Sequence, residues 1–236
     1  MLPKSKIKIV KSLKHKKNRI NSNLFIVEGI KSFNEVINSG YQIEFTAMSG
    51  ETYKSFYSKK KLNNLYVVSS DEVNKLSSLS NNNSLISVVK KRNLENKLID
   101  YSNLVIALDS INNPGNLGTI IRTADWFNIK SIICSRNTVD VYNSKVIQST
   151  MGSFTRVNVF YDELENILNN KDVKVYGTST NGDDIKKVGK LKSGIILFGS
   201  ESDGISENLK RYIDQWISIR RVGRAESLNV SVSAGV

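Results

Sequence analysis

Residues 104–134, LVIALDSINNPGNLGTIIRTADWFNIKSIIC, decide the fold class of this 236-residue chain. They open with the continuous apolar run Leu104–Leu108, which is typical of a strand buried on both faces of a parallel sheet. A helix is expected over about Leu117–Phe127, and a second strand over Ser131–Cys134. A strand, a helix and a second strand in this order predict a parallel α/β unit.

The same alternation continues to the end of the chain. Further strands are expected at Val157–Phe160, Val173–Tyr176, Ile195–Phe198 and Trp216–Ile219, with helices over about Asn143–Ser149, Tyr161–Leu168 and Ser206–Tyr212. This pattern predicts a mostly parallel sheet with helices on both faces. Because ligands of such sheets bind at the carboxyl ends of the strands, we expect a site in the loops that follow them.

The residues before this unit predict a second, smaller α/β domain. Strands are expected at Phe25–Val27, Ile43–Met48, Leu65–Val68 and Leu85–Val89, and helices over Ile30–Ile37, Thr52–Leu62 and from Ser70 or Asp71 to Leu79. The polar loop Asn81–Ser84 is either an RNA contact or a plain turn. The charged stretch Lys90–Asn103 is interpreted as a linker with its boundary near Asn96, which gives domains 1–96 and 97–236.

The charge of the chain points to a polyanionic partner. Its formal net charge is +12 and its pI about 9.6, which favours nucleic acid over a membrane; the alternative is a composition that is merely rich in Lys and Asn. The stretch Lys4–Arg19 carries basic residues and no acid, and Ile7, Val10 and Leu13 have helical spacing. This segment either rests on phosphates or is a solvated basic arm.

Several chemistries are excluded by what the sequence lacks. Cys134 is the single cysteine, which rules out an internal disulfide and fits a reducing cytoplasm. The single histidine, His15, lies in the basic arm, so no Ser-His-Asp triad is expected, and no Cys/His cluster has metal-ligand spacing. The dinucleotide and Walker glycine patterns are absent. No stretch approaches the roughly 18 apolar residues of a membrane span, and Met1–Lys17 lacks the apolar core of a signal peptide.

The first candidate motif is the stretch 113–124, NPGNLGTIIRTA. Pro114 and Gly115 are expected to form the turn out of the strand, with Asn116 capping the helix. Arg122 is expected near the start of this helix, where the helix dipole disfavours a cation, so it needs an anionic partner; a surface ion pair is the plainer alternative. Trp126 and Phe127 are expected in the core.

Two further motifs follow strand ends. In FGSESDGIS, residues 198–206, Gly199 allows close approach of a backbone or a ligand, and Glu201 accepts hydrogen bonds. In the closing stretch 219–236, IRRVGRAESLNVSVSAGV, a strand end and a loop lead into an apolar helix opened by Ser227-Leu228-Asn229. Ordinary N-capping is the plainer interpretation of Ser227.

The order NPGNxGxxxRTA, GSESDG and ESLNVSVSAG resembles the SpoU, or TrmH-type, family of RNA ribose methyltransferases. The resemblance covers nearly the whole chain. The stretch 25–40, FIVEGIKSFNEVINSG, resembles the family's small substrate-binding domain, and the stretch 145–153, KVIQSTMGS, also fits.

The resemblance implies a knotted fold, a cofactor and a dimer. The C-terminal domain would be an α/β methyltransferase domain with a deep trefoil knot, which no general folding rule predicts. Its cofactor would be S-adenosylmethionine, with Gly199, Ile219 and Leu228 at the matching positions and Thr178 as a weaker addition. The family acts as a homodimer with the knot region at the interface.

The resemblance also implies a reaction, the transfer of a methyl group to a ribose 2′-hydroxyl, which marks RNA. Arg122 matches the catalytic arginine, either as general base or as a cation that orients the 2′-oxygen; the pKa of arginine, above about 12, favours the second role. Asn116 and Asn229 would hold the geometry, Ser227 would bind the substrate phosphate, and Glu201 would orient the loop. Large-subunit ribosomal RNA is the preferred substrate, with transfer RNA as the alternative.

Two positions depart from the family's pattern. Arg220 stands where the family usually has proline, and the sequence stops at Val236, which is expected to leave the final helix short. These departures motivate a second hypothesis, an RNA-binding or ribosome-assembly protein that has kept the fold without turnover. A nucleotide-dependent oxidoreductase lacks its glycine fingerprint.

Overall fold

The computed structural model describes residues 1–56, 64–79, 82–95, 98–169 and 172–236. The chain forms two compact units: Met1–Asn93 with Tyr142–Thr155, and Leu94–Val141 with Arg156–Val236. The first unit thus includes a segment from far along the sequence. The expected boundary at Asn96 lies outside the described residues.

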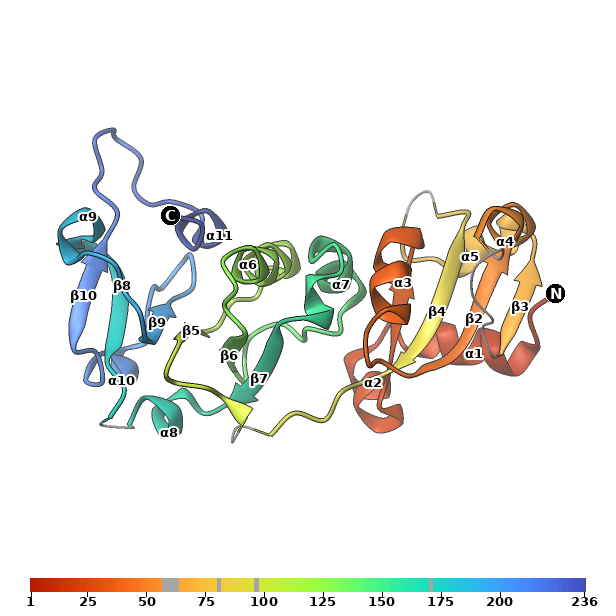
Figure 1. The fold of residues 1–236 in the computed structure, drawn as a ribbon, viewed down its shortest axis with the longest axis horizontal. Helices are drawn as coiled ribbons and strands as arrows, with labels where there is room; N and C mark the ends of the chain where they lie inside the picture. Colours follow the sequence, from red (N-terminus) through yellow and green to blue (C-terminus); the bar gives the residue numbers. More distant parts are fainter. Residues whose placement is uncertain (57–63, 80–81, 96–97, 170–171) are drawn as a thin grey trace. The chain divides into compact units, whose positions relative to one another are not determined.

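The first unit is built on a four-stranded sheet (Figure 1). Its strands are β1 (Leu24–Glu28), β2 (Ile43–Ser49), β3 (Leu65–Val68) and β4 (Leu85–Lys90), in the order β1-β4-β2-β3. Strand β4 runs antiparallel to β1 and β2, whereas β2 and β3 are parallel. The four expected strands are confirmed.

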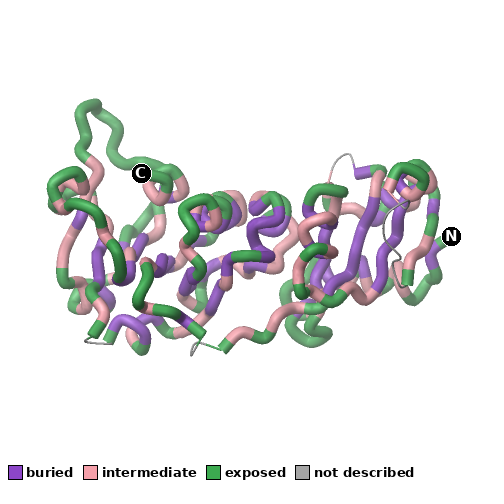
Figure 2. The backbone as a smooth tube through the Cα atoms, in the orientation of Figure 1, coloured by how far each residue is buried: buried purple, intermediate pink, exposed green. Residues whose placement is uncertain are grey.

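Helices cover both faces of this sheet because successive strand residues point to opposite faces. One face is covered by α1 (Lys4–Ser12) and α5 (Ser70–Leu76), and the other by α3 (Ile30–Ile37), α4 (Gly50–Phe56) and α7 (Ser144–Ser149). In β4, Ile86 and Val88 pack on the first face, and Leu85 and Val89 on the second. Figure 2 shows the resulting buried strands.

One local expectation for this unit changes, and two others are tested only in part. The cap of α5 is Ser69, whose side chain accepts from the Glu72 N–H in a capping box, rather than Ser70 or Asp71. Asn82 is buried and donates to the Leu85 carbonyl at 3.0 Å, which favours a turn in its loop; Asn81 lies outside the described residues. The expected helix over Thr52–Leu62 is described as far as Phe56.

The second unit is built on a six-stranded sheet whose neighbouring strands are all parallel. Its strands are β5 (Leu104–Leu108), β6 (Ser131–Ser135), β7 (Asn158–Asp162), β8 (Val175–Asp184), β9 (Gly194–Phe198) and β10 (Gln215–Ser218), in the order β10-β8-β9-β5-β6-β7. The predicted parallel α/β fold is therefore confirmed. The trefoil knot stays a prediction.

The helices of this unit are α6 (Pro114–Trp126), α8 (Leu164–Leu168), α9 (Ile185–Val188), α10 (Glu207–Lys210) and α11 (Val230–Ser233). Helices α8 and α10 bury Leu164, Leu168 and Leu209 in the core cluster that includes alternate residues of β5. Helix α6 buries Leu117, Ile120 and Ile121 and contacts α11.

Two features of the second unit differ from expectation. Trp126 and Phe127 are 86% and 58% exposed, so their placement in the core was wrong. Strand β8 is longer than predicted, and its pairing with β10 jumps from Gly177–Trp216 to Asp183–Ile217. The intervening residues 178–182 therefore bulge out of the ladder.

None of the helices in the described part of the chain is long and apolar enough to span a bilayer.

Candidate active site at the carboxyl ends of the parallel strands

A cavity of about 800 Å³ lies where β8, β9 and β10 end. Its walls include all four residues expected to bind a cofactor: Thr178, Gly199, Ile219 and Leu228. These residues come from four separate segments, which the parallel sheet brings together at one edge. The closing stretch of the chain supplies much of the remaining wall.

The loop after β9 depends on the absence of a side chain at Gly199. A Cβ atom there would lie 2.0 Å from the Gly204 carbonyl carbon and 2.2 Å from the Ile205 nitrogen. The backbones of Ser200 and Gly204 exchange two hydrogen bonds of 3.0 Å, which close the loop. The expected close backbone approach at Gly199 is confirmed, and the loop presents Glu201 at the cavity wall.

Asn116 joins this loop to the closing helix through its side-chain amide. Its Nδ2 donates to Glu201 Oε1, and its Oδ1 accepts from Asn229 Nδ2 at 3.1 Å. The three side chains, from α6, the β9 loop and the start of α11, form one chain of hydrogen bonds, which we call the amide relay. Asparagine suits its centre because one amide both donates and accepts.

The caps of both helices differ from expectation. Helix α6 is capped by Asn113, whose Oδ1 accepts from the N–H groups of Gly115 and Asn116 at 2.8 and 3.3 Å, so Asn116 is not the cap. Helix α11 is capped by Asn229, whose Oδ1 accepts from the Ser231 N–H at 2.9 Å. Ser227 does not cap a helix; it is exposed on the cavity wall.

Arg122 lies outside the cavity wall, on the exposed side of α6. It is the ninth of the helix's thirteen residues, so the expectation that it sits near the helix start was wrong. Within the described residues it makes no ion pair, and the surface-pair alternative therefore finds no support. Its guanidinium is available to an external anion.

Asp109 was missed by the sequence analysis. This residue follows β5 directly, is 4% exposed, and accepts from the Ser206 N–H at 2.8 Å and from Ser110 Oγ at 3.0 Å. Its own N–H donates to the Phe198 carbonyl at 2.9 Å. Asp109 therefore fixes both ends of the β9 loop to β5. An acidic residue directly after an apolar strand is the signal that would have identified it.

The remaining polar groups limit the chemistry of the site. Thr178 Oγ1 donates to the Leu197 carbonyl at 3.0 Å, so this hydroxyl braces β9. Burial raises the pKa of the Cys134 thiol, which makes it a poor nucleophile. In the described residues, no cluster of His, Cys, Asp and Glu could hold a metal ion.

The chain belongs to the SpoU rRNA Methylase family, whose model matches residues 103–236. A second family model, the MRM3-like substrate binding domain, matches residues 4–87. The resemblance noted from the motifs is thereby confirmed.

Individual relatives span nearly the whole chain. The chain is 27% identical over 235 residues to the 23S rRNA (guanosine(2553)-2′-O)-methyltransferase RlmP of Bacillus subtilis, covering 98% of this chain and 93% of that protein. A TrmH-family protein from Porphyromonas gingivalis superposes with a TM-score of 0.89 at 26% identity, covering 100% of this chain and 96% of the other. An AdoMet-bound rRNA methyltransferase from Sinorhizobium meliloti gives a TM-score of 0.88 at 25% identity, covering 100% and 93%.

Proposed function

We propose that this chain transfers a methyl group from S-adenosylmethionine to a ribose 2′-hydroxyl of RNA. The observation that carries the proposal is the cavity at the strand ends, whose wall combines Thr178, Gly199, Ile219 and Leu228 with Glu201 of the amide relay. Large-subunit ribosomal RNA is the preferred substrate, because the RlmP relative is named as a 23S rRNA enzyme and matches almost end to end.

The cavity fits the cofactor in size and in the character of its wall. Its volume of about 800 Å³ lies within the range of pockets for ligands of this size. Gly199 lets the Gly204 backbone close the loop that forms part of the wall, and Leu228, which is 50% exposed, offers apolar surface to the bound molecule. S-adenosylmethionine supplies a methyl group on a sulfonium cation, and the wall carries both carboxylates, among them Glu201 and Glu226, and cations, among them Arg220.

The residues around the cavity have distinct proposed roles. The amide relay holds the β9 loop against α6 and α11, which fixes the geometry that an in-line transfer requires. Ser227 offers an exposed hydroxyl to a substrate phosphate. Arg122 binds and orients the RNA as a permanent cation, because a guanidinium has hydrogen-bond donors and no acceptor for a proton.

We also propose a homodimer that works in the cytoplasm. Trp126 and Phe127 expose two adjacent aromatic side chains at the end of α6, and aromatic residues are enriched in the cores of protein interfaces. The buried, unpaired Cys134 thiol fits a reducing compartment. Light scattering with size-exclusion chromatography measures the assembly; a Trp126→Lys variant is expected to elute as a monomer.

The deciding experiment maps ribose methylation on ribosomal and transfer RNA from cells with and without this gene. Loss of one 2′-O-methyl mark in large-subunit ribosomal RNA is expected, and its restoration by purified protein with S-adenosylmethionine completes the test. Loss of a mark in transfer RNA alone would redirect the substrate. An unchanged map in both RNA classes would refute the proposal.

Arg220 motivates the second candidate, an RNA-binding protein of this fold without turnover. Its exposed side chain belongs to the wall of the cavity, and the family usually carries proline at this position. Calorimetry with S-adenosylmethionine separates the two functions. Micromolar binding supports the enzyme, whereas no detectable binding by a folded protein supports the second candidate.

A further inference from the structure

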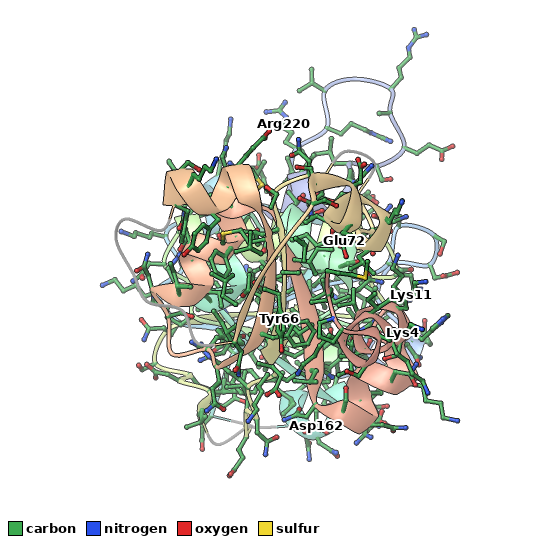
Figure 3. All side chains as sticks on the ribbon, turned by 90° about the vertical axis from the view of Figure 1, so that its right-hand side faces the viewer. Lys4, Lys11, Tyr66, Glu72, Asp162 and Arg220 are labelled. Atoms are coloured by element: carbon green, nitrogen blue, oxygen red, sulfur yellow. The ribbon has the colours of Figure 1, made fainter. Side chains whose placement is uncertain are left out.

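The outer side of α1 carries three lysines at helical spacing. Lys4, Lys8 and Lys11 follow one another at intervals of four and three residues, and all three are exposed. Such intervals place them on one side of the helix. We call these three residues the α1 lysine face. Figure 3 labels Lys4 and Lys11 on α1.

The opposite side of α1 is fixed in the core of the first unit. Val10 and Leu13 are buried in the cluster that includes Phe45, and the Lys6 ammonium lies 4.6 Å from the centre of the Phe45 ring. Before the helix, the buried Leu2 donates its N–H to Glu72 Oε1 at 3.2 Å. The helix therefore presents its exposed lysines from a rigid support.

The electrostatics of α1 oppose its own stability. No acidic residue occurs in residues 1–27, so the lysine face has no intrahelical ion pair. Like charges four residues apart destabilise a helix, and Lys4 at the helix start opposes the dipole. Apolar burial holds the helix in place despite this repulsion. An anion bound along the lysine face would relieve it.

We propose that the α1 lysine face binds consecutive phosphates of the RNA substrate, at a distance in sequence from the catalytic motifs. The identity of the anion as RNA rests on the proposed function. The helical rise separates Lys4 from Lys8 by about 6 Å and Lys8 from Lys11 by about 4.5 Å. These intervals suit a nucleic acid, which carries a charge on every nucleotide.

Two other partners fit this surface less well. A membrane-bound amphipathic helix inserts its apolar side into lipid, but the apolar side of α1 is already buried against the sheet. A protein interface has an apolar or aromatic core, whereas the exposed residues of α1 are all polar or charged: Lys4, Ser5, Lys8 and Lys11. The chemistry that remains is a flexible chain of phosphates.

The test replaces the three lysines together, as Lys4→Gln, Lys8→Gln and Lys11→Gln, in the full chain. The probe is a fluorescein-labelled hairpin of large-subunit ribosomal RNA, with binding followed by anisotropy over a series of KCl concentrations. Each lost contact lowers the slope of log K against log salt by about 0.7–0.9. The triple variant is therefore expected to lose about 2–3 from the slope and bind between about tenfold and a hundredfold more weakly near 0.1 M salt.

Two matched variants isolate the effect. The Lys→Arg triple at the same positions keeps the charge and is expected to retain both slope and affinity. A Gln triple at the exposed Lys130, Lys190 and Lys192 removes the same net charge elsewhere and is expected to retain most of the slope. Thermal melting checks folding, and the Gln triple on α1 should melt no lower than wild type because it removes repulsion.

The outcomes separate this inference from the proposed function. If the α1 Gln triple keeps the wild-type slope and affinity and still methylates RNA, the proposal that the α1 lysine face binds RNA is overturned. The proposed enzymatic function is then unaffected. A lysine-dependent slope in a chain that methylates no RNA supports the lysine face and refutes the enzyme. An equal loss of slope and affinity in the Lys130, Lys190 and Lys192 variant would show that net charge alone causes the effect. This outcome would also overturn the inference.

Discussion

The Gly199→Ala variant tests the construction of the cofactor cavity most directly. A Cβ at this position would lie 2.0 Å from the Gly204 carbonyl carbon and 2.2 Å from the Gly204 oxygen. Carbon atoms in contact lie about 3.5–4.0 Å apart, so the loop after β9 has to move by about 1.5 Å or more. The obstructing atoms belong to the backbone, which cannot yield by a change of rotamer.

This displacement has two expected costs. Overpacking of this kind lowers the free energy of unfolding by about 1–3 kcal/mol. The same movement strains the hydrogen bonds of Asp109 and of the amide relay, which hold the loop. We expect S-adenosylmethionine to bind at least about tenfold more weakly, which corresponds to about 1.4 kcal/mol.

Calorimetry with S-adenosylmethionine and urea unfolding measure the two costs separately. The control is Gly50→Ala, where an added Cβ meets no atom within 4 Å at the start of α4, and which should leave cofactor affinity unchanged. A Gly199→Ala protein that binds the cofactor within twofold of wild type would refute the reasoning, because the loop would then have relaxed without disturbing the cavity.

Four further predictions address other parts of the site. Arg122→Ala is expected to keep cofactor affinity and lose methyl transfer, measured with tritiated S-adenosylmethionine; turnover like wild type would remove Arg122 from the mechanism. Asp109→Ala should weaken cofactor binding at least tenfold and lower stability by about 1–3 kcal/mol, because it leaves the half-buried Ser206 N–H without its acceptor, whereas Asp109→Asn should restore part of both. Asn116→Asp replaces the donor that faces Glu201 by a second carboxylate, so its activity should fall. Burial raises the pKa of the Cys134 thiol above its value in the unfolded chain. The stability that the protonated thiol contributes is therefore present below about pH 8.5 and is lost as the pH rises above that value. Iodoacetamide should label Cys134 slowly until the protein unfolds, which checks that the thiol is buried.

Most of the fold could be predicted from the sequence because the strands are buried in a regular pattern that the sequence records. Strands β5, β6 and β9 are short apolar runs that are covered on both faces, and that composition distinguishes them from amphipathic helices. Strand β8 extends through polar residues to Asp184 because it pairs with β10, and pairing with a distant partner leaves no local signal. The assignment of Tyr142–Thr155 to the first unit has the same cause: Phe154 packs on Phe25, more than a hundred residues earlier.

Surface exposure was less predictable than strand position. An aromatic pair after an apolar helix usually belongs to a core, yet Trp126 and Phe127 extend past the last buried turn of α6. Composition cannot distinguish a buried aromatic side chain from one that awaits a partner chain. Their exposure supports the proposed homodimer, and the sequence pattern did not contain it.

The motif NPGN contains two asparagines, and local capping rules cannot decide between them. Asn113 takes the capping role, with its oxygen on the first N–H groups of α6, and this leaves the amide of Asn116 unused by its own helix. Asn116 then bridges Glu201 and Asn229, which lie 85 and 113 residues further along the chain. Asn229 does both tasks, because its oxygen caps α11 while its nitrogen joins the relay. The position of the closing helix and the position of the β9 loop are therefore held by the same three side chains. A substitution at any of them should disturb both of these walls of the cavity together.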